Sequence, residues 1–240
     1  MRGRIAGMLF LSLWASASWA DHPGAKIDAR YATPGLRLEV NELDSSTVHT
    51  KRYRLHANGF PEGIVFGVFT RHFEHSFEEA ASGFKVDRAA GDLVSNETGQ
   101  LQRLGEMVFE PGPYPRGAMW EVALVSEDRR LSAFAKVVPN PITARDGDCV
   151  LTLELVSKRG LRFLASGAGF APGDEVTTES TYAGRTVQQR RRVSSDGRLT
   201  PEVISHASTE ADRSARYAVR SRTCVVAVNY EWGAAALVSQ

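Results

Sequence analysis

Two stretches of the chain, residues 55–63 and 165–173, share a turn pattern in which a Gly-Phe pair is followed by a glycine three positions after the phenylalanine. Two more pairs of similar blocks follow in the same order, at residues 86–95 and 193–199 and at residues 118–122 and 215–219. One such block would mean little, because β-proteins reuse turn residues. Three blocks in one order indicate two copies of a single module.

Short alternating or β-branched runs, and almost no helical periods, make up each copy. The clearest runs are residues 36–40, 64–69, 120–125, 131–138, 150–156 and 225–230. Turn signals such as Asn58-Gly59 and Asp196-Gly197 separate the runs. Many short strands with frequent turns predict an all-β sandwich or barrel.

The repeated turn residues resemble the Gly-Phe-x-Pro-Gly and Asp-x-x-Gly-x-Leu pattern of bacterial immunoglobulin-like domains in exported proteins. The first copy departs from this pattern, with a longer Asp87-to-Gly91 spacing and a displaced proline. The resemblance implies two tandem immunoglobulin-like β sandwiches acting as spacers, adhesion modules or binding modules. It carries no catalytic residue.

The repeat also sets the expected domain boundaries. We expect module 1 at residues 28–138, a linker at 139–148 that begins with two prolines, and module 2 at 149–238. The segment from Leu93 to Ala118 spans 25 residues in module 1, against 16 from Leu199 to Ala215 in module 2. This difference predicts an insertion around residues 99–117, and insertions are common carriers of function.

Residues 1–20 have the pattern of a secretory signal peptide. Arg2 and Arg4 precede an apolar stretch at residues 5–14, and small residues surround a cleavage site after Ala20. A membrane anchor is the alternative, but serines interrupt the stretch, and no later segment is apolar enough to span. Arginine outnumbers lysine 24 to 5, a bias of GC-rich bacterial genomes. The expected location is therefore the bacterial periplasm or the outside of the cell.

Charge and cysteine content narrow the expected partners and compartment. Without the leader the chain has 27 basic and 28 acidic residues, so no overall field favours nucleic acid or an anionic membrane. The two cysteines, Cys149 and Cys224, both belong to module 2. An oxidising compartment favours a disulfide between them, and two unrelated buried thiols are the alternative.

His72, His75 and Glu79 form the best metal-like cluster. On a helix they would share one face, while Phe73 and Phe77 would lie on the other, and two imidazoles with a carboxylate suit zinc. The alternative, which we favour, is a strand running into a solvated loop with both phenylalanines packed on the core. The spacing matches no established metal motif.

The module 1 insertion offers a candidate binding surface. Met107, Phe109 and Tyr114 lie among three prolines, which would give a stiff loop with apolar anchors. The alternative is a loop that folds its own apolar residues over one end of the sandwich, which is the commoner arrangement.

Arg190 and Arg192 belong to the densest basic run and form a candidate anion patch. In a strand both would point one way, whereas Arg191 would share the apolar parity of Val187 and Val193. A lone arginine at that parity indicates a bulge or an edge strand, where charge discourages unwanted pairing. The sequence does not place three further arginines relative to this run: Arg216, Arg220 and Arg222.

Established catalytic motifs are missing from the sequence. There is no Gly-x-Ser-x-Gly, His-Glu-x-x-His, phosphate loop or Gly-x-Gly-x-x-Gly, and no cofactor is expected. We therefore expect an exported, non-catalytic binding or structural protein of the bacterial envelope whose partner is a protein or a glycan. The alternative is an envelope hydrolase or a metal-dependent enzyme that uses His72, His75 and Glu79.

Overall fold

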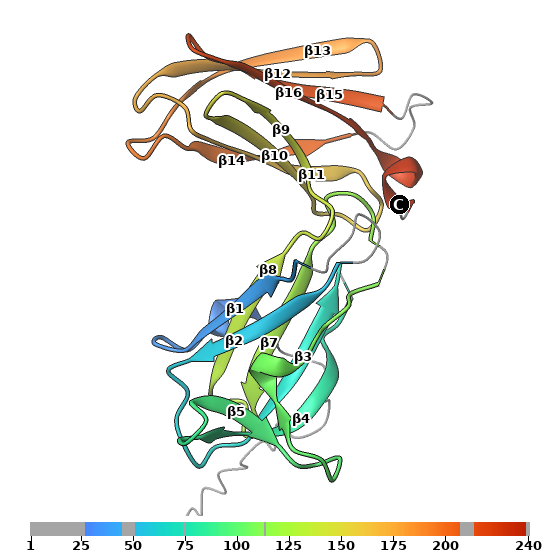
Figure 1. Ribbon diagram of the computed structural model, residues 1–240. Coiled ribbons are helices and arrows are strands. Elements are labelled where there is room, and N and C mark those ends of the chain that lie inside the picture. The colour runs from blue at the N-terminus through green and yellow to red at the C-terminus, as the bar shows by residue number, and fades with distance from the viewer. Residues whose placement is uncertain (1–26, 45–50, 74, 113, 207–213, 239–240) are drawn as a thin grey trace, which may run out of the picture.

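The structure, a computed structural model, describes residues 27–44, 51–73, 75–112, 114–206 and 214–238. The predicted signal peptide, residues 1–20, lies outside the described residues. The described chain forms four antiparallel sheets, and its longest helix is the five-residue 3-10 segment η3 (Gly233–Leu237) (Figure 1). The all-β prediction is confirmed. Nowhere in these ranges does a helix reach the length and hydrophobicity that a membrane span requires.

The N-terminal half contains a two-stranded sheet and a six-stranded sheet. The first pairs β1 (Arg37–Glu42) with β2 (Tyr53–Asn58). The second has the order β6 (Gln102–Arg103), β5 (Asp92–Ser95), β4 (Glu78–Asp87), β3 (Phe66–His72), β7 (Trp120–Ser126) and β8 (Ser132–Val137). Two 3-10 turns complete it, η1 (Ala29–Tyr31) and η2 (Leu104–Glu106). Alternate residues of β2 are buried, so one face of the hairpin packs on the core.

The C-terminal half contains two four-stranded sheets that face each other (Figure 1). One has the order β14 (Leu199–Ser205), β11 (Arg162–Ala168), β10 (Cys149–Leu155) and β9 (Ile142–Asp146). The other has the order β13 (Arg185–Arg192), β12 (Glu175–Tyr182), β15 (Ser214–Arg220) and β16 (Val225–Glu231). Strand β10 buries every second residue, which is the pattern of a sheet with one face on a core. This half is sandwich-like.

The two halves share a strand order. The run β4-β3-β7-β8 has the same connectivity as β13-β12-β15-β16, and the hairpin β1-β2 corresponds to β10-β11. Gly59 follows β2 with φ of +82°, and Gly169 follows β11 with φ of +78°. One difference is that β5 pairs with β4, whereas β14 pairs with β11. The repeated sequence blocks therefore lie at corresponding places in two similar strand orders.

The segment predicted as a linker, residues 139–148, contains a strand. Residues Ile142–Asp146 form β9, which pairs with β10 from Leu153↔Ile142 to Cys149↔Asp146. Ile142 is buried and Ala144 packs against the core. The two prolines lie just before β9 and not within it, so they leave its pairing intact. The prediction that the whole segment is a linker is therefore wrong for residues 142–146.

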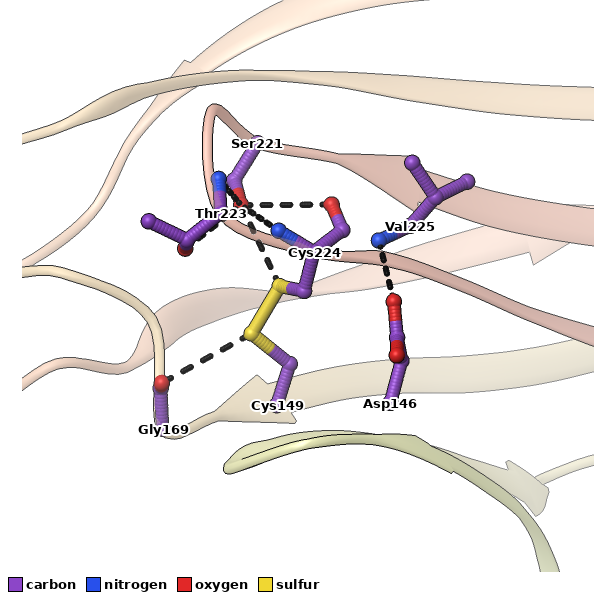
Figure 2. Close-up of a disulfide and its surroundings, with 7 residues drawn as sticks. All are labelled: Asp146, Cys149, Gly169, Ser221, Thr223, Cys224 and Val225. Atoms are coloured by element: carbon purple, nitrogen blue, oxygen red, sulfur yellow. Dashed lines mark hydrogen bonds between the residues drawn. A yellow bond between two sulfur atoms is a disulfide. The ribbon is translucent and has the colours of Figure 1, made fainter.

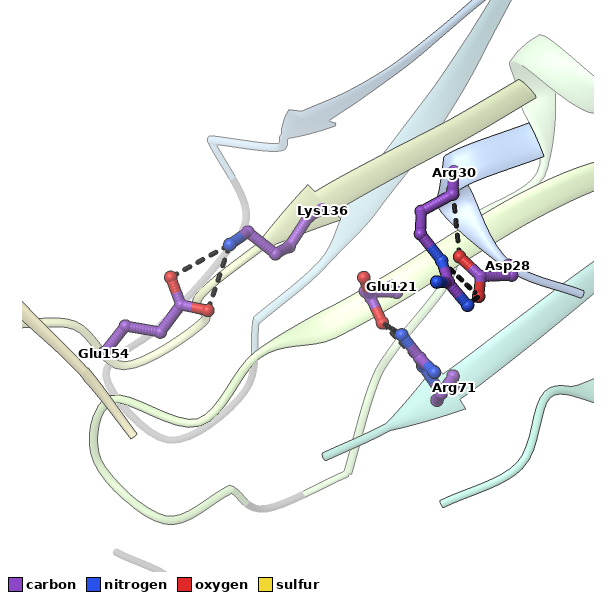
Figure 3. Close-up of polar contacts among 6 residues, drawn as sticks. All are labelled: Asp28, Arg30, Arg71, Glu121, Lys136 and Glu154. Carbon is purple, nitrogen blue, oxygen red and sulfur yellow. Dashed lines mark hydrogen bonds and ion pairs between the residues drawn. The ribbon is translucent and has the colours of Figure 1, made fainter. Parts of the chain in front are cut away.

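The two halves meet at the end of the module 1 insertion. Gly117 donates its N–H to the carbonyl of Asn140 at 2.7 Å and accepts from the N–H of Leu155 at 2.9 Å. Beside these bonds, Lys136 of β8 lies 2.9 and 3.0 Å from the two carboxylate oxygens of Glu154 on β10 (Figure 3). Backbone bonds and an ion pair thus connect the halves across the joint.

The predicted disulfide between Cys149 and Cys224 is confirmed. It joins the start of β10 to the turn between β15 and β16, with Cα atoms 6.5 Å apart (Figure 2). Nearby, the carboxylate of Asp146 accepts the backbone N–H of Val225 at 2.8 Å. The sandwich is therefore closed covalently on the side where β9 and β16 lie together.

Candidate functional site

The histidine cluster lies on strands and a turn, without a helix. His72 ends β3, His75 is exposed in the following turn, and Glu79 is exposed in β4. The Nδ1 atom of His72 is 2.7 Å from the hydroxyl oxygen of Tyr114, and their rings are stacked. Within the described ranges no group of three or more histidine, cysteine, aspartate or glutamate side chains is placed to hold a metal. The helical face on which the zinc hypothesis was built does not form.

The two phenylalanines of this segment pack on apolar clusters. Phe73 lies against the main core, and Phe77 is buried with Ala123 and Val125 on the other face of the sheet. Arg71 lies over the ring of Phe77 at 4.6 Å. It also donates its Nε–H to Glu121 at 2.5 Å (Figure 3). This is the strand-and-loop arrangement that the sequence left as the alternative to a metal site.

The insertion folds onto the core. Tyr114 is buried, and Met107 and Phe109 are half-buried and pack against the same cluster. Phe109 also forms a backbone bridge with Tyr53 of β2, with N···O distances of 2.9 Å in both directions. These three side chains face the protein interior and do not offer the exposed binding surface that the sequence suggested.

We expect that replacing residues 99–117 with a short turn will unfold the N-terminal half. The replacement removes buried Leu104 and Tyr114 and the two backbone hydrogen bonds by which Gly117 joins the halves. Losing two large core side chains should lower the free energy of unfolding by more than about 5 kcal/mol. Urea unfolding followed by near-ultraviolet circular dichroism measures it. The control Leu101→Ser, at a side chain that is 56% exposed, should change stability by less than about 0.5 kcal/mol. A shortened chain with the wild-type midpoint would contradict the expectation.

The arginine run lies on β13, an edge strand of the sheet β13-β12-β15-β16. Seven of its eight residues are exposed, and Arg191 is the exception. The edge position agrees with the interpretation of Arg191 as a charged residue at the apolar parity. Because β13 has a neighbour on one side alone, half of its backbone hydrogen-bonding groups face away from the sheet.

The hairpin turn before β13 determines which of its residues turn their N–H and C=O groups away from the sheet. Ala183 and Gly184 connect β12 to β13 with φ of +46° and +71°, the signs of a two-residue type I′ turn, which is closed by a hydrogen-bonded pair, here Tyr182↔Arg185. Hydrogen-bonded and non-hydrogen-bonded pairs then alternate along the ladder. The same parity continues past β13, where the N–H of Val193 bonds to the carbonyl of Asp174 at 2.8 Å. The even-numbered residues therefore present their N–H and C=O groups to the open edge: Thr186, Gln188, Arg190 and Arg192.

The side chains of these residues share the outer face of the sheet with a second arginine strand. Thr177 on β12 is the register partner of both Arg190 on β13 and Arg220 on β15, so the two arginines flank it in one row. Glu175, the register partner of Arg192, lies 3.7 Å from Arg190, and because both side chains are largely exposed this pair contributes little stability. Within the described residues, Arg192 and Arg220 form no ion pair. The result is a basic face beside an open edge.

Arg191 has a different role from its neighbours. Its Nη2 donates to the carbonyl of Thr200 at 3.2 Å, and its Nη1 lies 3.7 Å from Glu202, both on β14 of the opposite sheet. Glu202 also accepts the hydroxyl of Tyr217 at 2.9 Å, and burial raises the pKa of that tyrosine, so its hydroxyl stays protonated. This network connects β13 to β14 across the open side of the sandwich and holds the edge strand in place.

A cleft of about 500 Å³ lies near the turn of the same hairpin. Its polar lining includes Arg116 from the N-terminal half and Thr181, Asn229 and Glu231 from the C-terminal half. Volumes of this size are common for small-ligand sites. Both the cleft and the open edge thus border the β12–β13 hairpin.

His206, which the sequence did not single out, is buried at the end of β14. Its Nε2 lies 3.0 Å from the hydroxyl of Tyr230, and its ring stacks on Trp232 with centroids 4.8 Å apart. Tyr182 meets it edge-on at 4.9 Å. Desolvation lowers the pKa of His206 from its ordinary value near 6.5 to about 4, so the imidazole is neutral in the folded protein at pH 7.

We expect this histidine to make stability depend on pH between about 6.5 and 4. His206 binds a proton near pH 6.5 in the unfolded chain and near pH 4 in the folded chain. The stability that its neutral ring contributes is therefore complete above pH 6.5 and is lost as the pH falls through this window. The loss amounts to about 3 kcal/mol at most. Urea unfolding at pH 7 and pH 4.5 should show a smaller difference for His206→Phe than for wild type. Exposed His56→Gln should keep the wild-type difference, and an equal difference in His206→Phe would refute the assignment.

No protein-family model matches the chain, and a search of curated proteins finds no relative. The candidate site therefore rests on geometry and charge alone.

Proposed function

We propose that this protein is an exported, non-catalytic binding protein of the bacterial envelope that engages an envelope protein through β13 of its C-terminal half. The observation that carries the proposal is the long, exposed edge of β13 beside a face with three arginines, Arg190, Arg192 and Arg220. Free strand edges are common docking places for other chains.

The other edges of the C-terminal half are protected, which supports this choice. β14 carries Pro201, which has no N–H to offer a partner. β9 and β16 lie against each other and are joined through the Asp146–Val225 hydrogen bond and the nearby disulfide. Among the described strand edges of the C-terminal half, β13 has neither a proline nor a nearby covalent closure. Its arginine side chains are its one protection against pairing with other strands.

Two kinds of support favour export and an immunoglobulin-like architecture. The leader pattern at residues 1–20 and a disulfide that closes a long loop both suit an oxidising compartment. The order β10-β11-β14 facing β13-β12-β15-β16 is compatible with sandwiches of the immunoglobulin type, as are the alternating buried residues of both sheets. Such sandwiches commonly serve binding roles.

The test is site-specific photo-crosslinking of the full chain in a bacterium that exports it. A photoreactive residue replaces Gln188 on β13 or, as a control, Glu39 on β1, which is also exposed. We expect a mature chain that begins at Asp21, an oxidised Cys149–Cys224 pair, and an adduct with one envelope protein from position 188 alone. A chain that keeps its leader in the cytoplasm would overturn the proposal, as would the absence of protein adducts at position 188. Glycan adducts there would replace the protein partner with a glycan.

A further inference from the structure

We infer that the segment bound at this edge is an extended acidic strand that adds antiparallel to β13, with two carboxylates on alternate residues opposite Arg190 and Arg192. This inference rests on the proposed function and names the chemistry of the partner. It follows from the ladder parity, the charge of the edge strand and the exposure of its side chains.

The backbone parity sets the register of an added strand. The outward N–H and C=O groups belong to Thr186, Gln188, Arg190 and Arg192, which also point their side chains to the outer face of the sheet. A strand that bonds to these groups places every second side chain directly opposite them on that face. The remaining side chains of the partner lie opposite Val187, Gln189 and Arg191 on the other face.

Charge determines which residues can lie opposite. β13 contains four arginines and no acidic residue. Arg190 has a weak partner in Glu175, and Arg220 adds positive charge two strands away in the same row. Opposite-charge pairs across strands are stabilising and like charges are destabilising. Two glutamates at alternate positions of the partner therefore complement the edge.

The four arginines of β13, with no acidic residue beside them in the strand, argue against a second copy of this chain as the occupant. Pairing β13 with itself would bring eight guanidinium groups together without a carboxylate from either strand. Small polar or β-branched residues suit the positions opposite Thr186 and Gln188. An apolar residue suits the position opposite Val187, which is 45% exposed.

These requirements define a peptide probe with the sequence Glu-Thr-Glu-Thr-Thr-Val-Thr, which runs antiparallel to β13 with its glutamates opposite Arg192 and Arg190. The matched control peptide carries lysine in place of both glutamates. Binding is followed by amide chemical shifts of the full chain in nuclear magnetic resonance titrations. We expect saturable shifts at Gln188 and Arg190 with the acidic peptide, binding at least about tenfold weaker for the lysine peptide, and weaker binding at high salt.

Two variants separate strand addition from simple charge attraction. Gln188→Pro removes one outward N–H while leaving the β12–β13 ladder intact, because residue 188 belongs to a non-hydrogen-bonded pair with Glu179. Gln188→Ala removes the same side-chain bond to Glu179 but keeps the N–H. We expect Gln188→Pro to weaken the acidic peptide at least about tenfold and Gln188→Ala to bind it nearly as wild type does. Reversing both charges in Arg190→Glu/Arg192→Glu should reverse the preference between the two peptides.

Equal binding to both peptides would refute charge complementarity, and binding unaffected in a folded Gln188→Pro would refute strand addition. If Gln188→Pro does not fold, the double arginine variant and the amide map decide. Concentration-dependent dimerisation through β13 without peptide would make a second copy the occupant. A crosslink at position 188 without peptide binding would overturn this inference and leave the proposed function standing, whereas no crosslink overturns the function itself.

Discussion

Gly169→Ala is expected to destabilise the C-terminal half by more than about 4 kcal/mol, whereas Gly173→Ala is expected to cost about 1 kcal/mol. Both glycines have φ of +78°, so the backbone strain of an alanine is the same at each. A Cβ at position 169 would lie 1.9 Å from the carbonyl oxygen of Asp148, and nothing lies within 4 Å of one at position 173. The difference between the variants therefore measures the close approach of two backbones, which only glycine permits.

Urea unfolding of the two variants gives this difference directly. Gly59 is the counterpart of Gly169 in the N-terminal half, since a Cβ there would lie 2.4 Å from the carbonyl oxygen of Gly35. Gly59→Ala should therefore also cost more than Gly173→Ala. If Gly169→Ala and Gly173→Ala unfold at the same urea concentration, the repeated glycine is a general turn residue and not a packing requirement of the module.

Removing the disulfide in Cys149→Ala/Cys224→Ala is expected to cost about 4 kcal/mol. The bond closes a loop with a sequence separation of 75, and in the chain-entropy model a loop of this length restricts the unfolded chain by about that amount. It also anchors the turn between β15 and β16 to the start of β10. Chemical denaturation of the oxidised protein, the reduced protein and the double variant measures the effect.

The reduced protein serves as the control, because it keeps both cysteine side chains. It should unfold close to the double variant and well before the oxidised protein. A double variant as stable as the oxidised protein would show that the two strands hold each other without the bond. The expected loss makes the C-terminal half dependent on an oxidising compartment, in line with the proposed export.

Strands with strict alternation or β-branched runs were predictable from the sequence, and β10 and β16 lie almost where the pattern placed them. β9 was hidden because two prolines precede it, and proline occurs both at the start of strands and in stiff linkers. β4 was hidden because most of its residues are polar or small, although it pairs with the strands just before and after it in the chain, β3 and β5. Local patterns predict strands with clear alternation well, but they do not reveal which polar or proline-flanked segments join a sheet.

The candidate site was also predictable only where it depends on a local property of one strand. The parity of Arg191 predicted a bulge or an edge strand, and β13 is an edge strand; this much was predictable because parity is a local property of a strand. The row that joins Arg190 to Arg220 depends on β12 lying between β13 and β15, which no spacing in the sequence reveals. Tyr114 could not be assigned to the core, since an aromatic side chain in a proline-rich loop suits a surface as well as a core.

Amide hydrogen exchange along β13 in the free protein tests the central claim, an open basic edge, most directly. We expect fast exchange at Thr186, Gln188, Arg190 and Arg192 and slow exchange at the alternate residues Val187, Gln189 and Arg191, whose N–H groups bond to β12. Addition of the acidic peptide should slow exchange at Gln188 and Arg190. Slow exchange at these two amides in the free protein would contradict the account, because it would mean that the edge is already covered.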